Sequence, residues 1–244
     1  MFAAVQIIPL TDLAIAFLPV AVVVLILYRW SLGSGFAIYA LARMLLQLLA
    51  IGYVLTYIFE ADQPWIVLAA LTMMLGTASW IALRPLNVKG RSLYGKALVS
   101  IVLGGVSTLL LVTQVVLKID PWFAPPKMIP LAGMIFATAM NTISIAAERF
   151  QAEKQGGAAY TDARATAIRA AIIPLVNSLL AVGLVSLPGM MTGQILSGVD
   201  PLIAARYQIV VMCMIFGSSG ISSACFLTLL RPLDEEFTGD VEVQ

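Results

Sequence analysis

The residues able to do chemistry in this 244-residue chain are few, and they lie within long apolar segments. Arg43 and Gln47 are four residues apart, so a helix would carry both on one face. Asn141, Ser144 and Glu148 follow at spacings of three and four and form a second polar stripe. Polar groups inside a membrane are costly and are functional candidates by default. Both stripes are therefore candidate linings of a passage.

Each of these polar groups also has a structural interpretation. Arg43 lies about two turns inside its segment and can extend its side chain to the membrane surface, while Gln47 can bond a neighbouring helix. Asn141 and Asn177 can likewise form hydrogen bonds between helices. Arg43 would repel a cation, so a further hypothesis pairs it with Glu148. The residue pattern leaves these interpretations open.

The stretch 187–201 combines helix-breaking residues with soft and polar side chains. Pro188 and the glycines that follow predict a break in the helix, and exposed backbone at membrane depth must line a cavity or be buried in protein. Met190, Met191 and Gln194 lie here and complete the candidate pathway. Methionine is a soft metal ligand but also an ordinary packing residue, and the chain has no histidine. The sequence alone predicts no metal site.

The sequence argues against an enzyme, a motor and a nucleic-acid binder. A G-x-x-x-x-G-K string at 90–96 is followed by Ala97, where a P-loop needs Ser or Thr for Mg²⁺. No histidine and no G-x-S-x-G string is present, so hydrolysis inside the membrane lacks its groups. Fourteen basic against thirteen acidic residues leave no cationic face for nucleic acid. We expect no ATPase and no cofactor in this chain.

The elements that position these residues are predicted to be membrane helices. Hydrophobic residues make up 61% of the chain and charged residues 11%, against about 45–50% and about 25% in soluble domains. Windows of about 19 residues find seven apolar segments, at 11–28, 35–59, 65–83, 97–117, 129–147, 170–190 and 204–230. The predicted fold is an all-α bundle of about seven transmembrane helices in the lipid bilayer, a single transmembrane domain over residues 1–244.

The basic residues predict the orientation, because Lys and Arg are retained on the cytoplasmic side. When alternate loops between the spans are assigned to the same side of the membrane, ten basic residues fall on one side: Arg29, Arg84, Lys89, Arg91, Lys96, Arg149, Lys154, Arg164, Arg169 and Arg231. The other side has three, namely Lys118, Lys127 and Arg206. We therefore predict an outside N-terminus and a cytoplasmic C-terminus, the latter an acidic tail with Asp234, Glu235, Glu236, Asp240 and Glu242.

The longest predicted loop, residues 148–169, lies on the cytoplasmic side in this topology. No segment outside the membrane is long enough to fold alone, so a transporter powered by nucleotide would need its motor in a separate subunit. The loop is the candidate contact for that motor.

Several stretches resemble the FetB family of membrane permeases. They are residues 43–48 and 52–59, residues 129–134 leading to Asn141, and a long run over 168–174, 182–193 and 200–208. The resemblance extends from the second span to the start of the seventh. The last run is the most specific of these matches.

The resemblance implies the integral subunit of an ABC-type transporter assigned to iron export, with plant relatives linked to aluminium tolerance. It implies a pair of permease subunits in the cell (inner) membrane, docked on cytoplasmic ATPase subunits that hold ATP and Mg²⁺. The coupling contact falls on Glu153, Gly157, Asp162, Arg164 and Arg169. This loop is shorter than in the family and lacks its Leu-Gly-Ala. Two alternatives are an autonomous secondary transporter or channel, and an ABC permease for a non-metal solute such as a sugar nucleotide.

Overall fold

A computed structural model describes residues 8–60, 63–86, 90–233 and residue 237 of the chain. Within these residues seven helices are long and apolar enough to cross a membrane, which confirms the predicted all-α membrane bundle. The described residues contain no β-strand, only an isolated bridge between Val182 and Ser186. The chain divides into two compact units, residues 1–62 and 63–244, and each is described by itself.

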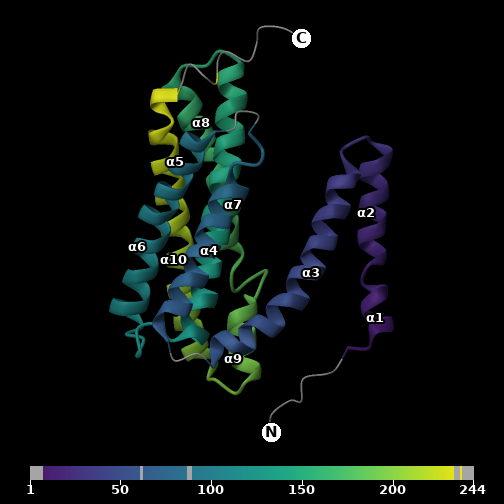
Figure 1. The fold of residues 1–244 in the computed structure, drawn as a ribbon, viewed down its shortest axis with the longest axis vertical. Coiled ribbons are helices and arrows are strands. Elements are labelled where there is room, and N and C mark those ends of the chain that lie inside the picture. Colours follow the sequence, from purple (N-terminus) through teal and green to yellow (C-terminus); the bar gives the residue numbers. More distant parts are fainter. Residues whose placement is uncertain (1–7, 61–62, 87–89, 234–236, 238–244) are drawn as a thin grey trace. The chain divides into compact units, whose positions relative to one another are not determined.

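The first unit is a helical hairpin. It contains α1 (Leu10–Ile15), α2 (Leu18–Arg29) and α3 (Ser34–Phe59), and α2 packs against α3 (Figure 1). Gly33 supplies the left-handed backbone at φ 73° that joins the two helices, a conformation glycine adopts without a steric cost. None of the side chains described in α2 and α3 is buried within the chain. Nearly all of this apolar surface is therefore open to lipid or to a protein neighbour.

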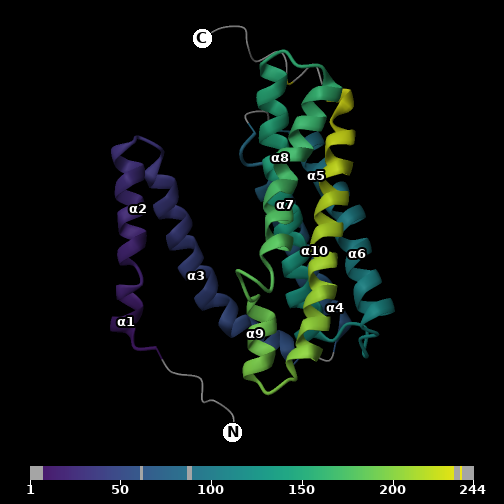
Figure 2. The same cartoon turned by 180° about the vertical axis from the view of Figure 1, so that it is seen from behind.

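The second unit contains five of the seven spans (Figures 1 and 2). Its last three spans are α7 (Pro125–Gln155), α8 (Tyr160–Ala181), which a short turn joins to α7, and α10 (Pro201–Leu229). The short α9 (Gly189–Leu196) lies between α8 and α10 in the sequence, and the 3-10 turn η3 (Arg231–Leu233) follows α10. The unit begins with α4 (Pro64–Ala82) and the span Arg91–Val116, which consists of α5 (Arg91–Ile101), η1 (Val102–Val106), α6 (Ser107–Leu110) and η2 (Leu111–Val116).

Helix α7 forms the core of the second unit, where it packs against α4, α8 and α10 (Figures 1 and 2). Its buried face repeats at helical spacing and includes Met128, Ala132, Ile135, Ala139 and Ile143. Such a period of three and four residues turns one stripe of a helix toward its neighbours. The opposite face, with Asn141 and Glu148, is exposed. The stripe thus orients the helix within the bundle.

The span Arg91–Val116 crosses α10 at very close range. A Cβ atom at Gly104 would lie 2.6 Å from the backbone nitrogen of Ser222 and 2.8 Å from the backbone oxygen of Ser218. Small residues allow such backbone approach between membrane helices, where packing drives association. The contact coincides with the π-helical segment η1, and both serines are fully buried. Glycine at position 104 is therefore required by the packing.

The segment 148–169, predicted as a loop, is instead a helical hairpin. Helix α7 continues to Gln155, and α8 begins at Tyr160 after a turn that includes Gly157 at φ 83°. The charged residues in this region do not end the helix, because Arg149 and Glu153 form an ion pair one turn apart and Phe150 is fully buried. The hydropathy windows located the apolar part of each helix and missed its polar extension.

The sixth span also lies earlier than the predicted 170–190. Helix α8 ends at Ala181, where Val182 turns extended and Gly183 takes φ 83°. Pro188 then precedes the separate helix α9, so the break predicted for this stretch is present. The acidic tail predicted near residues 234–242 lies outside the described residues, as does Lys89.

Candidate functional site

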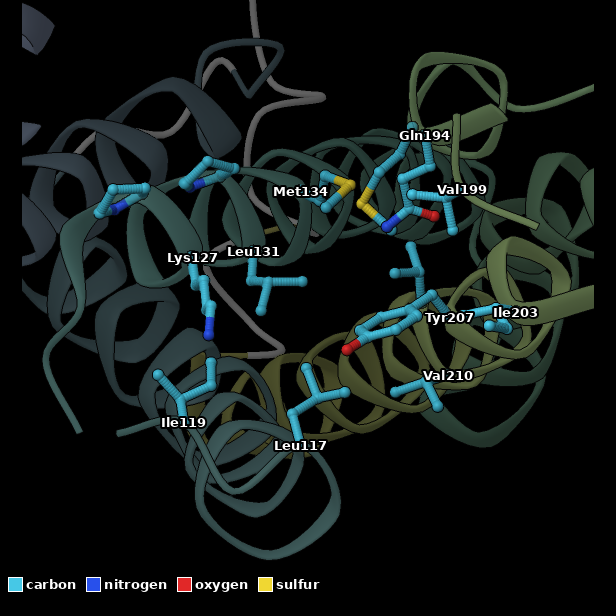
Figure 3. Close-up of a pocket in the computed structure, with 14 residues that line it drawn as sticks. Leu117, Ile119, Lys127, Leu131, Met134, Gln194, Val199, Ile203, Tyr207 and Val210 are labelled. Atoms are coloured by element: carbon cyan, nitrogen blue, oxygen red, sulfur yellow. The ribbon is translucent and has the colours of Figure 1, made fainter. Parts of the chain in front are cut away.

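A cavity of about 500 Å³ lies in the second unit (Figure 3). Helix α9, which lines it, is at the end of this unit opposite the α7–α8 turn (Figure 1). The first turns of α7, helix α9 and the first half of α10 supply most of its wall, and its volume falls in the range of small-ligand pockets. Figure 3 shows the Lys127 ammonium and the Tyr207 hydroxyl pointing toward the space between α7 and α10, with Met134 and Gln194 across from them.

A second cavity of about 270 Å³ adjoins the first. The two share Met134, Met190 and Val211 in their walls, so these residues lie where the cavities meet. The second cavity adds Gln208 and Met212 from α10 and the non-helical stretch between α8 and α9. The irregular backbone after Ala181 therefore lines a cavity, as backbone at membrane depth must when it is not buried in protein.

Methionine and glutamine recur in this wall with the same spacing. Met190 and Gln194 lie one turn apart on α9, and Gln208 and Met212 lie one turn apart on α10. Met134 on α7 completes the set. We call these five residues the Met/Gln site.

The two glutamines present amide oxygens that have no hydrogen-bond partner. The Oε1 atoms of Gln194 and Gln208 are both inaccessible to solvent and unpartnered, and the Gln208 side chain is buried, with the residue 5% exposed. A buried acceptor left unpaired costs about 1–3 kcal/mol. Both glutamines line the cavities, but these two oxygens are out of reach of a water molecule, so a ligand supplies the missing partner only after the amide turns.

The donor set of the site is neutral. It consists of thioether sulphurs and amide oxygens, and the described residues contain no group of three His, Cys, Asp or Glu side chains able to hold a metal. The nearest cation in the wall is Lys127, seven residues before Met134 and thus about 10 Å away along the helix. The arrangement can coordinate a cation through lone pairs, but it supplies no negative charge to offset a high ionic charge.

Comparison with known proteins places this architecture in a family. Residues 10–232 match the profile described as "Uncharacterised protein family (UPF0014)". The chain belongs to the UPF0014 family. It is 39% identical over 207 residues to "UPF0014 membrane protein slr1647" of Synechocystis, covering 78% of this chain and 79% of the relative. No solved structure matches the chain significantly.

Two further relatives confirm the resemblance noted in the sequence. One is "Probable iron export permease protein FetB" of Escherichia coli, 35% identical over 240 residues and covering 89% of both chains. The other is "Protein ALUMINUM SENSITIVE 3" of Arabidopsis thaliana, 34% identical over 236 residues and covering 90% of this chain and 85% of the relative. This UPF0014 protein is therefore a membrane protein of a permease family.

The structure brings only some of the predicted pathway residues of this UPF0014 chain together. Met190 and Gln194 meet in the cavity, whereas Met191 does not line either cavity. Arg43 and Gln47 lie on α3 in the first unit, so their relation to the Met/Gln site and the pairing of Arg43 with Glu148 stay predictions.

The other predicted pathway residues lie on exposed helix faces. Asn141 and Glu148 share the exposed stripe of α7. Asn177 lines a shallow pocket of about 320 Å³ on α8 together with Arg169. Their part in a pathway also stays a prediction.

Sequence reasoning did not select Met134, Gln208 and Met212. The signal that could have identified Gln208 and Met212 is the methionine–glutamine spacing of four, which occurs at 190/194 and again at 208/212. This spacing places each pair on one helix face. That Met134 joins them is a property of the tertiary fold, since α7 is distant in sequence from α9 and α10.

The predicted coupling residues of this UPF0014 protein gather around the α7–α8 turn. Glu153 pairs with Arg149 before the turn, Gly157 lies in it, and Asp162 and Arg164 follow in the first turns of α8. Arg169 lies about one turn further on.

Aromatic packing holds this turn against the end of α10. The Tyr160 hydroxyl donates a hydrogen bond to the backbone oxygen of Leu227 at 2.9 Å. The Phe150 ring meets those of Tyr160 and Phe237 edge to face, at 5.9 Å and 5.6 Å between centroids. The guanidinium of Arg164 lies over the Tyr160 ring at 5.5 Å. Tyr160 therefore links α7, α8 and α10 at one end of the bundle.

Proposed function

We propose that this protein is the membrane permease subunit of an ABC-type exporter that moves a metal cation out of the cytoplasm across the cell membrane. Iron is the first candidate, because the Escherichia coli relative is named a probable iron export permease. The observation that carries the proposal is the Met/Gln site, a cavity in a membrane bundle whose wall offers unpartnered oxygen and sulphur lone pairs.

The energy for transport comes from a separate cytoplasmic ATPase in this proposal. The one P-loop-like string, at 90–96, runs into helix α5 with Ala97 at the Mg²⁺ position. The partner docks on the α7–α8 turn, the end that the charge pattern predicts to be cytoplasmic. The Tyr160 hydroxyl bonds the Leu227 carbonyl near the end of α10. A displacement of the turn by the ATPase would therefore move α10, and the first half of α10 lines the cavity.

The remaining predicted residues complete the route in the same proposal. Asn141 and Glu148 on α7 and Asn177 on α8 border it between the cavity and the cytoplasmic end, with Arg43 and Gln47 on α3 contributing from the first unit. Exposed polar groups at membrane depth support this role, because lipid does not satisfy them. The permease works as a pair of such subunits, since two copies would cover these faces and match two ATPases.

A second candidate substrate is an anionic organic solute such as a sugar nucleotide. Lys127 and Tyr207 favour it, since an ammonium and a hydroxyl in a cavity of about 500 Å³ suit a phosphate-bearing ligand. Stimulation of ATP hydrolysis by a metal ion distinguishes a metal cargo from an organic one.

The proposal is tested by ATP hydrolysis in proteoliposomes that contain the permease, a candidate P-loop subunit, or both. We expect the permease alone to hydrolyse no ATP, and Fe²⁺ to stimulate hydrolysis only when both are present. Arg164→Glu, at the α7–α8 turn, should abolish the stimulation, whereas Arg206→Glu, an equally exposed arginine at the other end, should preserve it. Equal loss in both variants, or hydrolysis that ignores the permease, would contradict the assignment.

A further inference from the structure

The Met/Gln site has a donor set with a strong preference among cations. Thioether sulphur is a soft ligand that selects soft cations such as Cu(I), whereas Fe²⁺ and harder divalent ions favour imidazole and carboxylate. The cavity walls hold three methionines and two glutamines and no carboxylate. A neutral donor set balances a single positive charge more readily than two, because the surroundings are of low polarity.

The geometry points to a convergent site rather than scattered packing methionines. Met134 and Met190 come from two different helices and line both cavities, so both reach the junction between them. On α10, Gln208, Val211, Met212 and Ile215 occupy one helix face, which turns the Gln208 amide and the Met212 thioether to the same cavity.

The buried amide gives an independent indication of a ligand. Gln208 is 5% exposed, it lines the second cavity, and its Oε1 atom has no hydrogen-bond partner. The neighbouring core residues Val211 and Met214 on the same helix are apolar, whereas buried polar residues recur further along it, from Ser218 to Ser223. The oxygen itself is out of reach of a water molecule, so it reaches a cation in the cavity when the amide turns, and the cation would then take both sulphur and oxygen.

We propose that the Met/Gln site binds a soft monovalent cation, Cu(I) or its analogue Ag(I), through the thioethers of Met134, Met190 and Met212 with the Gln208 amide oxygen as a supporting ligand. This goes beyond the proposed function, because the binding requires neither iron nor an ATPase. Lys127 lies near the site and opposes the cation by charge repulsion, which keeps its binding weak enough for release.

The test is titration of the purified full-length protein in detergent with Ag(I) in chloride-free buffer. Cys213 and Cys225 are free thiols and would bind Ag(I) themselves, so both are first replaced by alanine. We expect this protein to bind one Ag(I), and Met134→Leu and Met190→Leu each to weaken binding at least tenfold. Met128→Leu is the matched control, a fully buried methionine on α7 outside both cavities, and should leave the affinity unchanged.

X-ray absorption of the Cu(I)-loaded protein without cysteines gives a second readout that needs no further variant. Sulphur neighbours around the metal are expected, and a shell of oxygen or nitrogen alone would overturn the proposal. Absence of binding, or equal affinity in Met128→Leu, Met134→Leu and Met190→Leu, would overturn it as well. The inference rests on the same site as the proposed function, so its failure would remove that site as support for a metal cargo. Because binding is measured on the permease alone, it would leave the dependence of transport on a separate ATPase to be tested by the proteoliposome assay.

Discussion

At the scale of the residue, four buried side-chain atoms in the described part of the chain lack a hydrogen-bond partner, and two of them belong to residues of the cavity walls. The other two are the hydroxyls of Ser219 and Ser222 on α10. Buried polar groups in folded proteins are nearly always paired, and each exception requires an explanation. Here the amide oxygens of Gln194 and Gln208 are both unpartnered, and both lie in the wall of a cavity. The explanation favoured by their position is ligand binding, at a cost to the stability of the empty protein.

Gln208→Leu tests this stability cost. Replacing an unpaired buried amide by an apolar side chain of similar size removes a penalty of about 1–3 kcal/mol, so the unfolding temperature of the purified protein should stay equal or rise. Gln114→Leu is the control, because the Gln114 amide donates to the Thr113 hydroxyl at 3.0 Å and to the Trp122 carbonyl at 3.4 Å. Thermal unfolding followed by circular dichroism compares the two variants. A larger fall in unfolding temperature for Gln208→Leu than for Gln114→Leu would show that the Gln208 amide is paired after all.

At the scale of the element, the bundle depends on close helix contacts in which side chains are small. The π-helical segment η1 holds Gly104 and Gly105 against α10 and α7, where Ser222 and Ile135 are the nearest neighbours. Helix α10 carries four buried serines, Ser218, Ser219, Ser222 and Ser223, and of these Ser218 and Ser222 lie against Gly104. The segment η1 can approach α10 closely only because its glycines leave room for the α10 backbone.

Gly104→Ala should therefore destabilise the protein. The new Cβ atom would come within 2.6 Å of the Ser222 backbone nitrogen, so the two helices must separate, at an expected cost of about 1–3 kcal/mol. Gly95→Ala, on α5 of the same span, meets nothing within 4 Å and should stabilise the helix by about 0.5–1 kcal/mol. Chemical denaturation of both variants in detergent measures the sign of the change in the free energy of unfolding. Equal changes in the two variants would contradict the close packing at Gly104.

Tyr160→Phe probes the link between the α7–α8 turn and α10. The variant keeps the ring contact with Phe150 but loses the hydrogen bond to the Leu227 carbonyl, at a cost of about 0.5–1.5 kcal/mol. We also expect weaker stimulation of the partner ATPase by substrate, because the turn is no longer fastened to α10. Tyr53→Phe, at a side chain 76% exposed on α3, should change neither quantity.

The sequence predicts the elements better than the site. Seven apolar segments and the break after α8 follow from hydropathy and from Pro188, because both are local properties. The polar extension of α7 to Gln155 does not follow from hydropathy, since Phe150 and the Arg149–Glu153 ion pair stabilise the helix outside the apolar window. Met190 and Gln194 were selected from sequence, but their meeting with Met134 depends on how α7, α9 and α10 pack.

At the scale of the whole molecule, direction of transport depends on topology. The α7–α8 turn and helix α9, which lines the cavity, lie at opposite ends of the second unit (Figures 1 and 2). The charge asymmetry of ten basic residues against three predicts the turn on the cytoplasmic side. The cavity would then lie near the outer face, where an exporter releases its cargo.

Cysteine labelling tests this orientation. In a protein whose Cys213 and Cys225 are replaced by alanine, Ala159→Cys at the α7–α8 turn should react with a membrane-impermeant maleimide only after the cells are permeabilised. Ser197→Cys, exposed just beyond α9, should react in intact cells. The opposite labelling pattern would reverse the topology and, with it, the inferred direction of transport.

The central claim is that this permease exports a metal cation only with a separate ATPase. The most direct measurement is uptake of Fe²⁺ into inverted membrane vesicles that contain the permease, the candidate P-loop subunit, or both, with and without ATP. The account predicts uptake only when both proteins and ATP are present, and loss of uptake when the partner's P-loop lysine is replaced. Uptake by the permease alone would identify a secondary carrier, and no uptake with both proteins and ATP present would contradict iron as the cargo.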